Sequence, residues 1–346
     1  MRLVISKIKV CLVAPFPPPS GGMSVQAQIL LDCLRREAIV VYPVKTNREG
    51  KIWVTRTLAF AKDLLRSILA SNVVHVFTAL GSYTSLAITA MCVLTPRVFG
   101  RRLIVSHHSS ANRFLNRWSF LVRSIYRMAN VVTAQSGYLA NIFSQLGIRS
   151  YEFPNLLDTS EFEYVERNNF SPKLLFARHL IPAYGAEDAI IAYQIIVEKR
   201  PDATLTIVGD GSERRKLENM ARRLGLTVRF MGGLNHEEMS GVYRTNDIFL
   251  ICSKGDNFPM VILEAAASGL PIVSTRVQGI PYMIQDGRNG ILVSPGNCSE
   301  MAQAVLNLID NPDRARCLAR RAKEFADECT WEKNKLRLFS IYLGNV

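Results

Sequence analysis

The stretch Ser253-Lys-Gly-Asp-Asn-Phe-Pro-Met-Val-Ile-Leu-Glu-Ala-Ala-Ala-Ser-Gly-Leu-Pro271 joins a predicted strand to a predicted helix. It places two carboxylates, Asp256 and Glu264, eight residues apart across that transition. If the helix begins near Pro259, Asp256 lies just before it and Glu264 lies one turn inside. Both then reach the crevice at the carboxyl ends of the strands, where open α/β sheets bind ligands. Carboxylates accept hydrogen bonds from diols, so the pair suits a hydroxyl-rich ligand. A capping Asp with a surface Glu is the alternative.

Outward from this stretch, apolar strands and amphipathic helices alternate along the whole chain. Such alternation indicates parallel sheets and an α/β fold class. At about 150 residues per domain, a chain of 346 residues forms two domains. Their boundary is predicted near Pro154-Asn155, where the charge balance also changes. Strands are predicted at 9–14, 73–77, 103–106, 131–133, 173–177, 204–208, 228–231, 248–252 and 272–275, and helices at 24–36, 185–198, 212–224, 260–267 and 299–308.

Composition excludes several classes of protein. Hydrophobic residues make up 48% and charged residues 21% of the chain, which is typical of a globular protein and not of a disordered or fibrous one. Lys7 and Lys9 interrupt the N-terminal apolar stretch, so no secretory leader is expected. The run 80–98 is too polar to span a bilayer and is predicted to be a buried helix. The seven cysteines are never closer than twelve residues, which predicts buried thiols in a reducing cytosol and no metal site.

The net charge of +13 is concentrated in the first half of the chain. Residues 1–150 hold 19 Lys and Arg against 4 Asp and Glu, a net +15, whereas residues 151–346 carry −2. No acidic residue occurs between Asp63 and Glu152. This asymmetry predicts an anionic partner for the first half, either lipid or nucleic acid. Because the chain lacks the signatures of nucleic-acid-binding modules, we expect an anionic membrane surface and no nucleic acid.

A basic helix is predicted over residues 111–129. At 100° per residue, four arginines fall within an arc of about 120°, and they are Arg113, Arg117, Arg123 and Arg127. Phe120 lies among them, while the opposite arc carries Phe114, Trp118, Leu121, Val122, Ile125 and Met128. The segment 56–69 is a second amphipathic candidate, with Arg56, Lys62 and Arg66. A basic arc with an aromatic tip suits an anionic bilayer; the alternative is a domain helix with a solvated basic face.

Two glycine-containing loops follow predicted strands. Gly21 and Gly22 lie at the start of a helix, where backbone N–H groups and the helix dipole attract phosphate. The second loop, Val208-Gly-Asp-Gly-Ser212, lacks the third glycine of a nicotinamide fingerprint. By themselves these loops are ordinary turns.

The ordered series of motifs resembles the GT4 family of retaining glycosyltransferases, whose fold is GT-B. The segment from Asp256 to Glu264 resembles the family's EX7E segment. The other motifs are Gly21-Gly22, Ser106-His-His-Ser109, Thr133-Ala-Gln-Ser136, Pro154-Asn155, Ala177-Arg-His-Leu180, Val208-Gly-Asp-Gly211, Arg229-Phe-Met-Gly232, Gly269-Leu-Pro-Ile-Val-Ser274, Gly279-Ile-Pro281 and Asp286-Gly-Arg-Asn-Gly-Ile-Leu-Val293.

The resemblance implies two Rossmann-like doubly wound parallel-sheet domains facing across a cleft. Residues 1–155, joined by a C-terminal helix over 331–346, would bind the acceptor and face the membrane, and residues 156–330 would bind the nucleotide sugar. His108, Asp256 and Arg178 are the implied catalytic residues. The implied donor-binding residues are Gly21, Gly22, Arg178, Tyr184, Gly209, Phe230, Asn257, Phe258, Pro259 and Glu264.

The resemblance also implies individual roles. Arg178, expected as an exposed cleft residue, would bind the donor diphosphate beside Gly22, and Glu264 would hold the ribose hydroxyls. Asp256 would meet the hydroxyls of the transferred sugar, next to the backbone N–H groups of Asn257 and Phe258. A turn at 230–232 would lie along the nucleobase, and His108 would close the sugar pocket from the first domain.

Three positions depart from the family pattern. Asp256 stands where Glu is usual, which shortens the reach by about 1.5 Å. Tyr184 stands where a lysine is usual, so one contact to the diphosphate is in question. Leu156 replaces the glycine that usually follows the interdomain Pro-Asn. We interpret these residues as a variant site rather than an inactive one.

The implied function is transfer of a hexose, with retention, from a UDP- or GDP-sugar. The acceptor would be lipid-linked or a polysaccharide, in the synthesis of a bacterial-type surface polysaccharide or glycolipid. The enzyme would need no metal and no cofactor other than the nucleoside-diphosphate sugar as co-substrate. It would be cytoplasmic and peripheral on the inner face of the membrane. The alternatives are a catalytically weakened sugar-nucleotide-binding partner subunit and a GT-B sugar-nucleotide epimerase.

Overall fold

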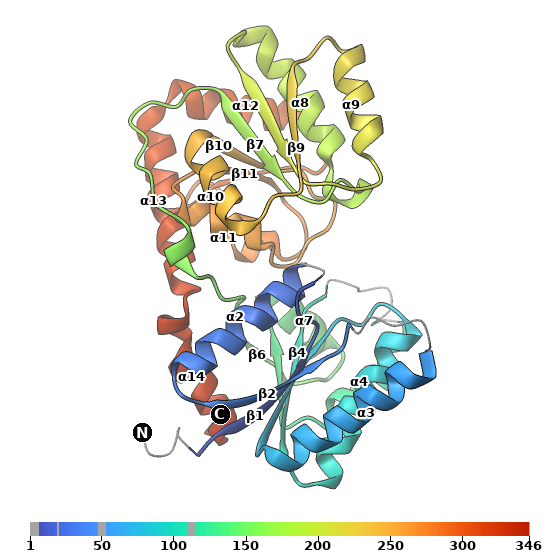
Figure 1. Cartoon of the computed structure of the whole chain (residues 1–346). Coiled ribbons are helices and arrows are strands. Elements are labelled where there is room, and N and C mark those ends of the chain that lie inside the picture. The colour runs from blue at the N-terminus through green and yellow to red at the C-terminus, as the bar shows by residue number, and fades with distance from the viewer. Residues whose placement is uncertain (1–6, 19–20, 48–52, 110–114, 116, 346) are drawn as a thin grey trace. The chain divides into compact units, whose positions relative to one another are not determined.

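The computed structural model describes residues 7–18, 21–47, 53–109, 115 and 117–345. The chain forms two α/β units (Figure 1), each with its own parallel sheet. Unit 1 comprises Met1–Leu156 and Trp331–Val346, and unit 2 comprises Leu157–Thr330. The boundary lies between Leu156 and Leu157, whereas the sequence placed it between 155 and 156.

The sheet of unit 1 has six parallel strands in the order β2-β1-β3-β4-β5-β6. Parallel strands covered on both faces are continuously apolar, and all six residues of β3 are buried. The sequence did not predict β2 and β6. The strands are β1 (Lys9–Ala14), β2 (Val40–Lys45), β3 (Val73–Thr78), β4 (Arg102–His107), β5 (Val131–Ala134) and β6 (Tyr151–Glu152).

Helices cover both faces of this sheet. One face packs against α2 (Gly22–Arg36) and the C-terminal helix α14 (Trp331–Leu343), through Leu34 and Leu338 among others. The opposite face packs against α3 (Trp53–Ala70), α4 (Tyr83–Val98), α6 (Ser119–Tyr126) and α7 (Gly137–Gln145). The end of the chain therefore completes the core of the unit in which the chain begins.

The sheet of unit 2 has six parallel strands in the order β12-β11-β10-β7-β8-β9. The strand order reverses between β7 and β10, since β7 leads to β8 on one side while β10 and β11 lie on the other. The strands are β7 (Lys173–Ala177), β8 (Thr204–Val208), β9 (Val228–Gly232), β10 (Ile248–Ile251), β11 (Ile272–Thr275) and β12 (Ile291–Val293).

The helices of unit 2 also divide between the two faces of the sheet. One core contains residues of α8 (Ala186–Lys199), α9 (Arg214–Arg223) and α12 (Cys298–Asp310). The other contains residues of α10 (His236–Thr245), α11 (Met260–Ala267) and α13 (Pro312–Glu328). Single 3-10 turns occur at η1 (Thr159–Glu161), η2 (Pro182–Tyr184) and η3 (Ile280–Tyr282).

Three predicted elements need correction. The run 80–98 forms α4, but α4 is not a buried helix, because only one of its sides packs on the sheet and Tyr83, Leu94 and Val98 are exposed. Of the basic helix expected over 111–129, Leu115, Arg117 and α6 (Ser119–Tyr126) are helical, residues 127–129 are not, and residues 111–114 and 116 lie outside the described residues. The turn expected at 230–232 is instead the end of β9, because the segment pairs with β8.

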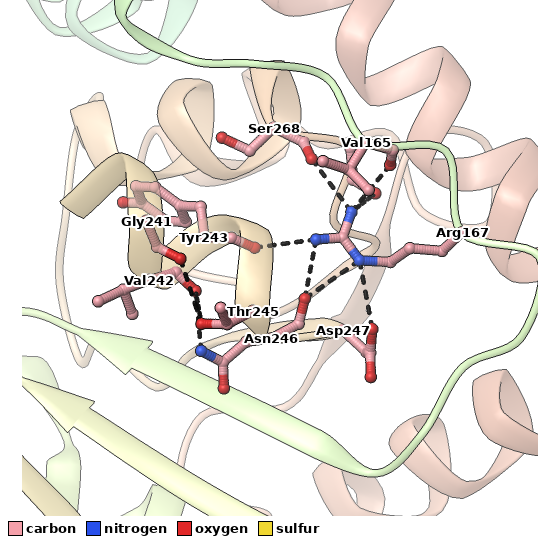
Figure 2. A network of polar contacts seen from close by, with 10 residues as sticks. Val165, Arg167, Gly241, Val242, Tyr243, Thr245, Asn246, Asp247 and Ser268 are labelled. Atoms are coloured by element: carbon pink, nitrogen blue, oxygen red, sulfur yellow. Dashed lines mark hydrogen bonds and ion pairs between the residues drawn. The ribbon is translucent and has the colours of Figure 1, made fainter. Parts of the chain in front are cut away.

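Arg167 is a buried charge that the sequence analysis missed. Its guanidinium lies beside the C-terminal ends of α10 and α11 (Figure 2), where helix carbonyl groups lack partners within the helix. Its Nε also forms an ion pair with Asp247 Oδ1 at 3.3 Å. The guanidinium donates hydrogen bonds of 2.8–3.1 Å to the backbone oxygens of Val165, Tyr243, Asn246, Ser268 and Gly269. One side chain thus holds two helices and an irregular segment together.

We expect Arg167→Met to lower the free energy of unfolding by about 3 kcal/mol, the lower end for breaking a buried ion pair. Methionine retains much of the side-chain volume but leaves the carbonyl oxygens and Asp247 without their donor. Urea denaturation measures the change. Arg320→Met is the matched control, because Arg320 is 66% exposed and should change stability by less than about 0.5 kcal/mol. Equal midpoints for the two variants contradict the assigned role.

Candidate functional site

The candidate site of unit 2 lies where the strand order reverses, at the carboxyl ends of β7 and β10. Open α/β sheets bind ligands at such a point, because the loops after the two strands diverge there. The loop after β7 contains Arg178 and Tyr184, and the loop after β10 contains Asp256. These three predicted site residues come together although up to 78 residues separate them in sequence.

Arg178 is held by a charge on one side and a ring on another. Its Nη2 forms a hydrogen-bonded ion pair with Asp256 Oδ2, and the two side chains are 11% and 14% exposed. Its Cζ lies 3.9 Å from the centroid of the Tyr184 ring, a cation–π contact. The expectation of an exposed cleft residue was therefore wrong, because Asp256 and Tyr184 cover the guanidinium. Nε of Arg178 is buried and makes no hydrogen bond with the described residues, so the group keeps unused donor capacity.

Both carboxylate oxygens of Asp256 accept hydrogen bonds from neighbouring residues. Besides Arg178, Oδ2 accepts from the Ser253 hydroxyl at 3.4 Å, and Oδ1 accepts from the Asn257 backbone N–H at 3.0 Å. Burial raises the pKa of Asp256, and the Arg178 charge and these donors oppose that rise. The Asn257 N–H, which the sequence offered to a ligand, is thus used inside the protein in this structure.

Glycines allow the loops around this pair to approach closely. Gly209 follows β8 with φ +131°, and a Cβ there would lie 1.9 Å from the Arg178 carbonyl oxygen. Gly279 donates its N–H to the Asp256 carbonyl at 3.0 Å, and a Cβ on it would lie 2.0 Å from the Asn257 oxygen. A larger residue would displace the backbone of Arg178 at the first position and that of Asn257, the neighbour of Asp256, at the second. The predicted site residue Gly209 therefore shapes the site through its backbone.

Glu264 lies inside α11, as predicted, but it is buried. Its Oε2 accepts a hydrogen bond of 2.8 Å from the hydroxyl of Tyr243, which belongs to α10. Burial raises the pKa of Tyr243 well above 10, and the adjacent Glu264 charge raises it further. Sequence reasoning missed Tyr243, because its partner is 21 residues away and no local pattern marks the pair.

The apolar members of the predicted set have structural partners. Phe230 is half-buried on β9 and packs against a core of unit 2, and Phe258 is buried in the other core. Pro259 is the N-cap residue of α11, which begins at Met260. The structure does not place Phe230 in the Arg178–Asp256 pair, since β8 separates β9 from β7.

In unit 1, Gly21 and Gly22 begin α2, as predicted. Gly21 is the N-cap residue, and its N–H donates to the Ser24 hydroxyl at 2.8 Å. One of the expected phosphate donors is therefore engaged within the loop. A Cβ on Gly22 would meet no atom within 4 Å, so space is open at the first residue of the helix.

His108 directly follows β4 and is half-buried. It lines a small cavity of about 20 Å³ with Phe77, Gln135 and Asn155. Burial lowers the pKa of His108 well below 6.5, and the charges of His107 and His75 act in the same direction. His108 is therefore a neutral imidazole, which can orient a hydroxyl group but brings no positive charge.

The predicted membrane-contact arginines are described in part. Arg113 lies outside the described residues, whereas Arg117, Arg123 and Arg127 are exposed. Phe120, which the helical projection placed among the arginines, is 78% exposed. Leu121, which the projection placed on the buried arc, is 41% exposed, because the short helix buries chiefly Val122 and Tyr126.

The part of the chain that the structure describes lacks two features. Within it, no three His, Cys, Asp or Glu side chains gather as a metal ion would require. None of its helices combines the length and the apolar character needed to cross a bilayer.

The sequence model of the family described as "Glycosyl transferases group 1" matches residues 159–325. The chain is 24% identical over 254 residues to the sulfoquinovosyl transferase SQD2 of Arabidopsis thaliana, covering 66% of this chain and 49% of that protein. It is 34% identical over 167 residues to the D-inositol 3-phosphate glycosyltransferase of Corynebacterium kroppenstedtii, covering 46% of this chain and 37% of that protein. The chain thus spans half or less of the length of these two relatives.

The fold is similar to that of Anabaena HepE in its complex with UDP-glucose. The TM-score is 0.74 at 19% identity, over 98% of this chain and all of HepE. This likeness confirms the predicted fold, with two Rossmann-like parallel-sheet domains.

Proposed function

Since residues 159–325 match the sequence model of the glycosyl transferases group 1 family, we propose that this chain is a retaining glycosyltransferase. It moves a hexose from a UDP- or GDP-sugar to a lipid-linked or polysaccharide acceptor. Both relatives described above are named as glycosyl-group transferases, and HepE binds UDP-glucose. The proposed pathway is synthesis of a surface polysaccharide or glycolipid.

The observation that carries this proposal is the Arg178–Asp256–Tyr184 group at the strand-order reversal. A planar guanidinium suits a diphosphate, because it donates paired charge-assisted hydrogen bonds. The usual lysine of the family pattern is absent, and the Tyr184 ring lies against the remaining cation instead. Asp256 and Tyr184 therefore fix the orientation of Arg178 before a ligand arrives, which reduces the cost of ordering it on binding.

In the proposed mechanism, negative charge grows on the leaving diphosphate. Arg178 and the backbone N–H groups at Gly22 stabilise that charge. Hydrogen-bond donors that are already held in place stabilise developing charge most strongly where water is excluded. Glu264, already positioned by Tyr243, accepts hydrogen bonds from the donor ribose. His108 orients a sugar hydroxyl and does not act as a base. The acceptor hydroxyl oxygen forms a bond to the anomeric carbon on the face from which the diphosphate leaves, as the bond from that carbon to the diphosphate oxygen breaks. The hydroxyl proton passes to the departing diphosphate oxygen, and the anomeric configuration is retained.

Thermal-shift measurements with UDP- and GDP-sugars test the proposed donor class. A ligand at a hundred times its Kd stabilises the folded protein by about 2.7 kcal/mol, which is readily measured. Transfer from the stabilising donor to an added acceptor supports a transferase. Turnover of the donor without acceptor supports the epimerase, and binding without any turnover supports the partner subunit. If no nucleotide sugar stabilises the protein, the proposed function is wrong.

We expect Glu264→Gln to weaken donor binding about ten-fold, the order expected for loss of a hydrogen bond to a charged acceptor. A 2′-deoxyribose donor should bind the wild type more weakly than the ribose donor does. It should lose little further affinity in the variant, because the contact is already absent. Isothermal titration calorimetry measures the affinity of both donors for the wild type and for Glu264→Gln. Equal losses in the two proteins contradict the ribose assignment.

We propose further that unit 1 binds the inner face of an anionic cell membrane. The protein would then lie in the reducing cytosol, where cysteines remain free thiols. The helices α3, α4 and α6 cover one face of its sheet, and α4 contacts both of the others. Figure 1 shows α3 and α4 side by side. Their outer sides carry exposed apolar residues, which are Leu58, Leu65, Leu69, Tyr83, Ile88, Leu94, Val98, Phe120 and Leu121. Exposed basic residues lie on or beside the same helices, namely Lys62, Arg66, Arg97, Arg117, Arg123 and Arg127. We call this set the α3–α4–α6 surface, and its mixture of apolar and basic side chains suits a bilayer interface.

A further inference from the structure

A group of polar side chains lies at the carboxyl ends of β4, β5 and β6 in unit 1. His108 follows β4, Gln135 follows β5, and Asn155 follows β6 after a short connection. The His108 ring stacks on Phe77, with ring centroids 4.2 Å apart and planes at 24°. Its Nδ1 lies 2.5 Å from the Gln135 amide nitrogen, and the same nitrogen donates to Asn155 Oδ1 at 2.5 Å.

These contacts determine where the imidazole proton lies. An amide nitrogen carries two hydrogens and accepts none. One hydrogen of Gln135 is directed to Asn155, so the other is directed to His108 Nδ1, which must then be the acceptor. In a neutral imidazole with Nδ1 as acceptor, the proton is on Nε2. Burial lowers the pKa of His108 well below 6.5 and keeps the ring neutral near pH 7.

Nε2 of His108 is buried and has no hydrogen-bond partner among the described residues. The ring lines the cavity of about 20 Å³, which has room for about one water-sized oxygen atom. His75 lines the same cavity but differs, because Nδ1 contacts the Tyr342 hydroxyl at 2.8 Å and Nε2 contacts the Ser106 hydroxyl at 2.6 Å. His108 is thus the cavity histidine with a donor to spare.

We propose that Gln135 is a positioning residue that, together with Asn155, holds His108 as the Nε2–H tautomer for donation to a hydroxyl oxygen of a bound sugar. The sugar as ligand rests on the proposed function, whereas the tautomer rests on the hydrogen-bond geometry alone. The role of Gln135 is to fix the direction of one hydrogen bond. Without it, the ring would divide its population between two tautomers, only one of which presents a donor at Nε2.

Nitrogen NMR of protein labelled with ¹⁵N-histidine tests the tautomer. Long-range ¹H–¹⁵N spectra distinguish Nδ1–H, Nε2–H and imidazolium rings, and His108→Asn identifies the His108 signals. We expect wild-type His108 to show the Nε2–H pattern. In Gln135→Glu, the carboxylate only accepts, so His108 should change to the Nδ1–H or imidazolium pattern. The His75 signals, whose partners are untouched, are the internal control.

Two results overturn the assignment of Gln135. One is an Nδ1–H pattern in the wild type, which requires both amides to be oriented oppositely. The other is an unchanged tautomer in folded Gln135→Glu. If Gln135→Glu does not fold, Gln135→Leu replaces it. That variant removes the donor without adding charge and should give a mixture of both tautomers, and a pure Nε2–H pattern there contradicts the proposal equally.

A second measurement separates the sugar contact from the tautomer. UDP-glucose and GDP-mannose are compared with UDP and GDP as probes. We expect a sugar nucleotide to shift the His108 Nε2 signal, and the diphosphate alone to leave it unchanged. Gln135→Glu should reduce affinity for the sugar nucleotide about ten-fold, the upper range for one neutral hydrogen bond, and leave diphosphate affinity intact. If a sugar nucleotide binds without moving the His108 signal, the sugar contact is wrong. If none of the four probes binds, the proposed function fails, while the tautomer result stands.

Discussion

Arg178→Ala is expected to change both ligand binding and stability. Loss of a charge-assisted contact of about 1.5–3 kcal/mol should weaken binding of UDP or GDP about ten- to hundred-fold. The variant also leaves Asp256, 14% exposed, without its cation. An uncompensated buried charge costs about 3 kcal/mol or more, so the free energy of unfolding should fall by that order near pH 7. The expected stability loss corrects the view of Arg178 as an exposed residue that could be removed freely.

The pH dependence of this loss has a definite sign. Burial already raises the pKa of Asp256 in the wild type, and Arg178 is the charge that opposes the rise. Without Arg178, the folded state holds a proton on Asp256 at a pH where the unfolded chain has released it. Stability of the variant then falls as pH rises, so its deficit relative to the wild type should shrink from about pH 8 to about pH 5.

A double variant separates binding from stability. In Arg178→Ala with Asp256→Asn, no buried carboxylate remains unpaired, so most of the stability should return while diphosphate affinity stays low. Urea denaturation and isothermal titration calorimetry measure the two effects. If calorimetry shows wild-type diphosphate affinity in folded Arg178→Ala, the donor site has been assigned to the wrong residues. If the double variant is no more stable than Arg178→Ala, the ion pair is not the cause of the loss.

Most of the fold could be predicted because its elements are encoded locally. The predicted strands 173–177, 204–208 and 272–275 agree with β7, β8 and β11, and the predicted helix 260–267 agrees with α11. Buried parallel strands are continuous apolar runs, which can be recognised without knowing their neighbours. The exposed outer side of α4 could not be predicted in the same way. An apolar run in the sequence is equally compatible with a helix buried in the domain and with a helix whose outer side contacts a membrane or another molecule.

The candidate site was predicted residue by residue but not as a set of contacts. Arg178 and Asp256 were both named, yet their ion pair depends on β7 lying beside β10, which the sequence does not specify. Tyr184 was named as a donor-binding residue at a position where lysine is usual, but the contact of its ring with Arg178 was not predicted. Arg167 and Tyr243 were missed because their partners lie tens of residues away. Long-range polar contacts of this kind follow from the topology, whereas strands and helices follow from local pattern.

The structure places the excess positive charge of the sequence in unit 1. The basic first half of the sequence becomes unit 1, and exposed apolar side chains accompany its arginines on the α3–α4–α6 surface. A basic face that only increases solubility has no need of Phe120 at 78% exposure or Val98 at 80% exposure. A bilayer would accommodate both kinds of side chain, because its acyl chains contact the apolar residues and its anionic headgroups contact the arginines.

Reversing Arg117, Arg123 and Arg127 to glutamate should abolish binding to anionic vesicles. Each basic residue near such a surface contributes about 1 kcal/mol, and each glutamate adds repulsion. The combined loss should therefore exceed about a hundred-fold in affinity, since 1.4 kcal/mol is a factor of ten. Co-sedimentation with phosphatidylglycerol vesicles measures it. Wild-type protein should bind these vesicles, be released as salt rises from 0.1 M to 1 M and the screening length falls from about 10 Å to about 3 Å, and ignore phosphatidylcholine vesicles.

A control with the same change in net charge isolates the surface. Arg222, Arg223 and Arg314 are exposed on unit 2, and their reversal to glutamate should leave most vesicle binding intact. Phe120→Ser should weaken binding without changing its salt dependence, because it removes apolar contact and no charge. Both triple variants should retain diphosphate affinity, which we assign to Arg178. If the unit 2 variant loses as much binding as the unit 1 variant, net charge alone drives association. If the folded unit 1 variant binds like the wild type, the α3–α4–α6 surface is not the membrane contact.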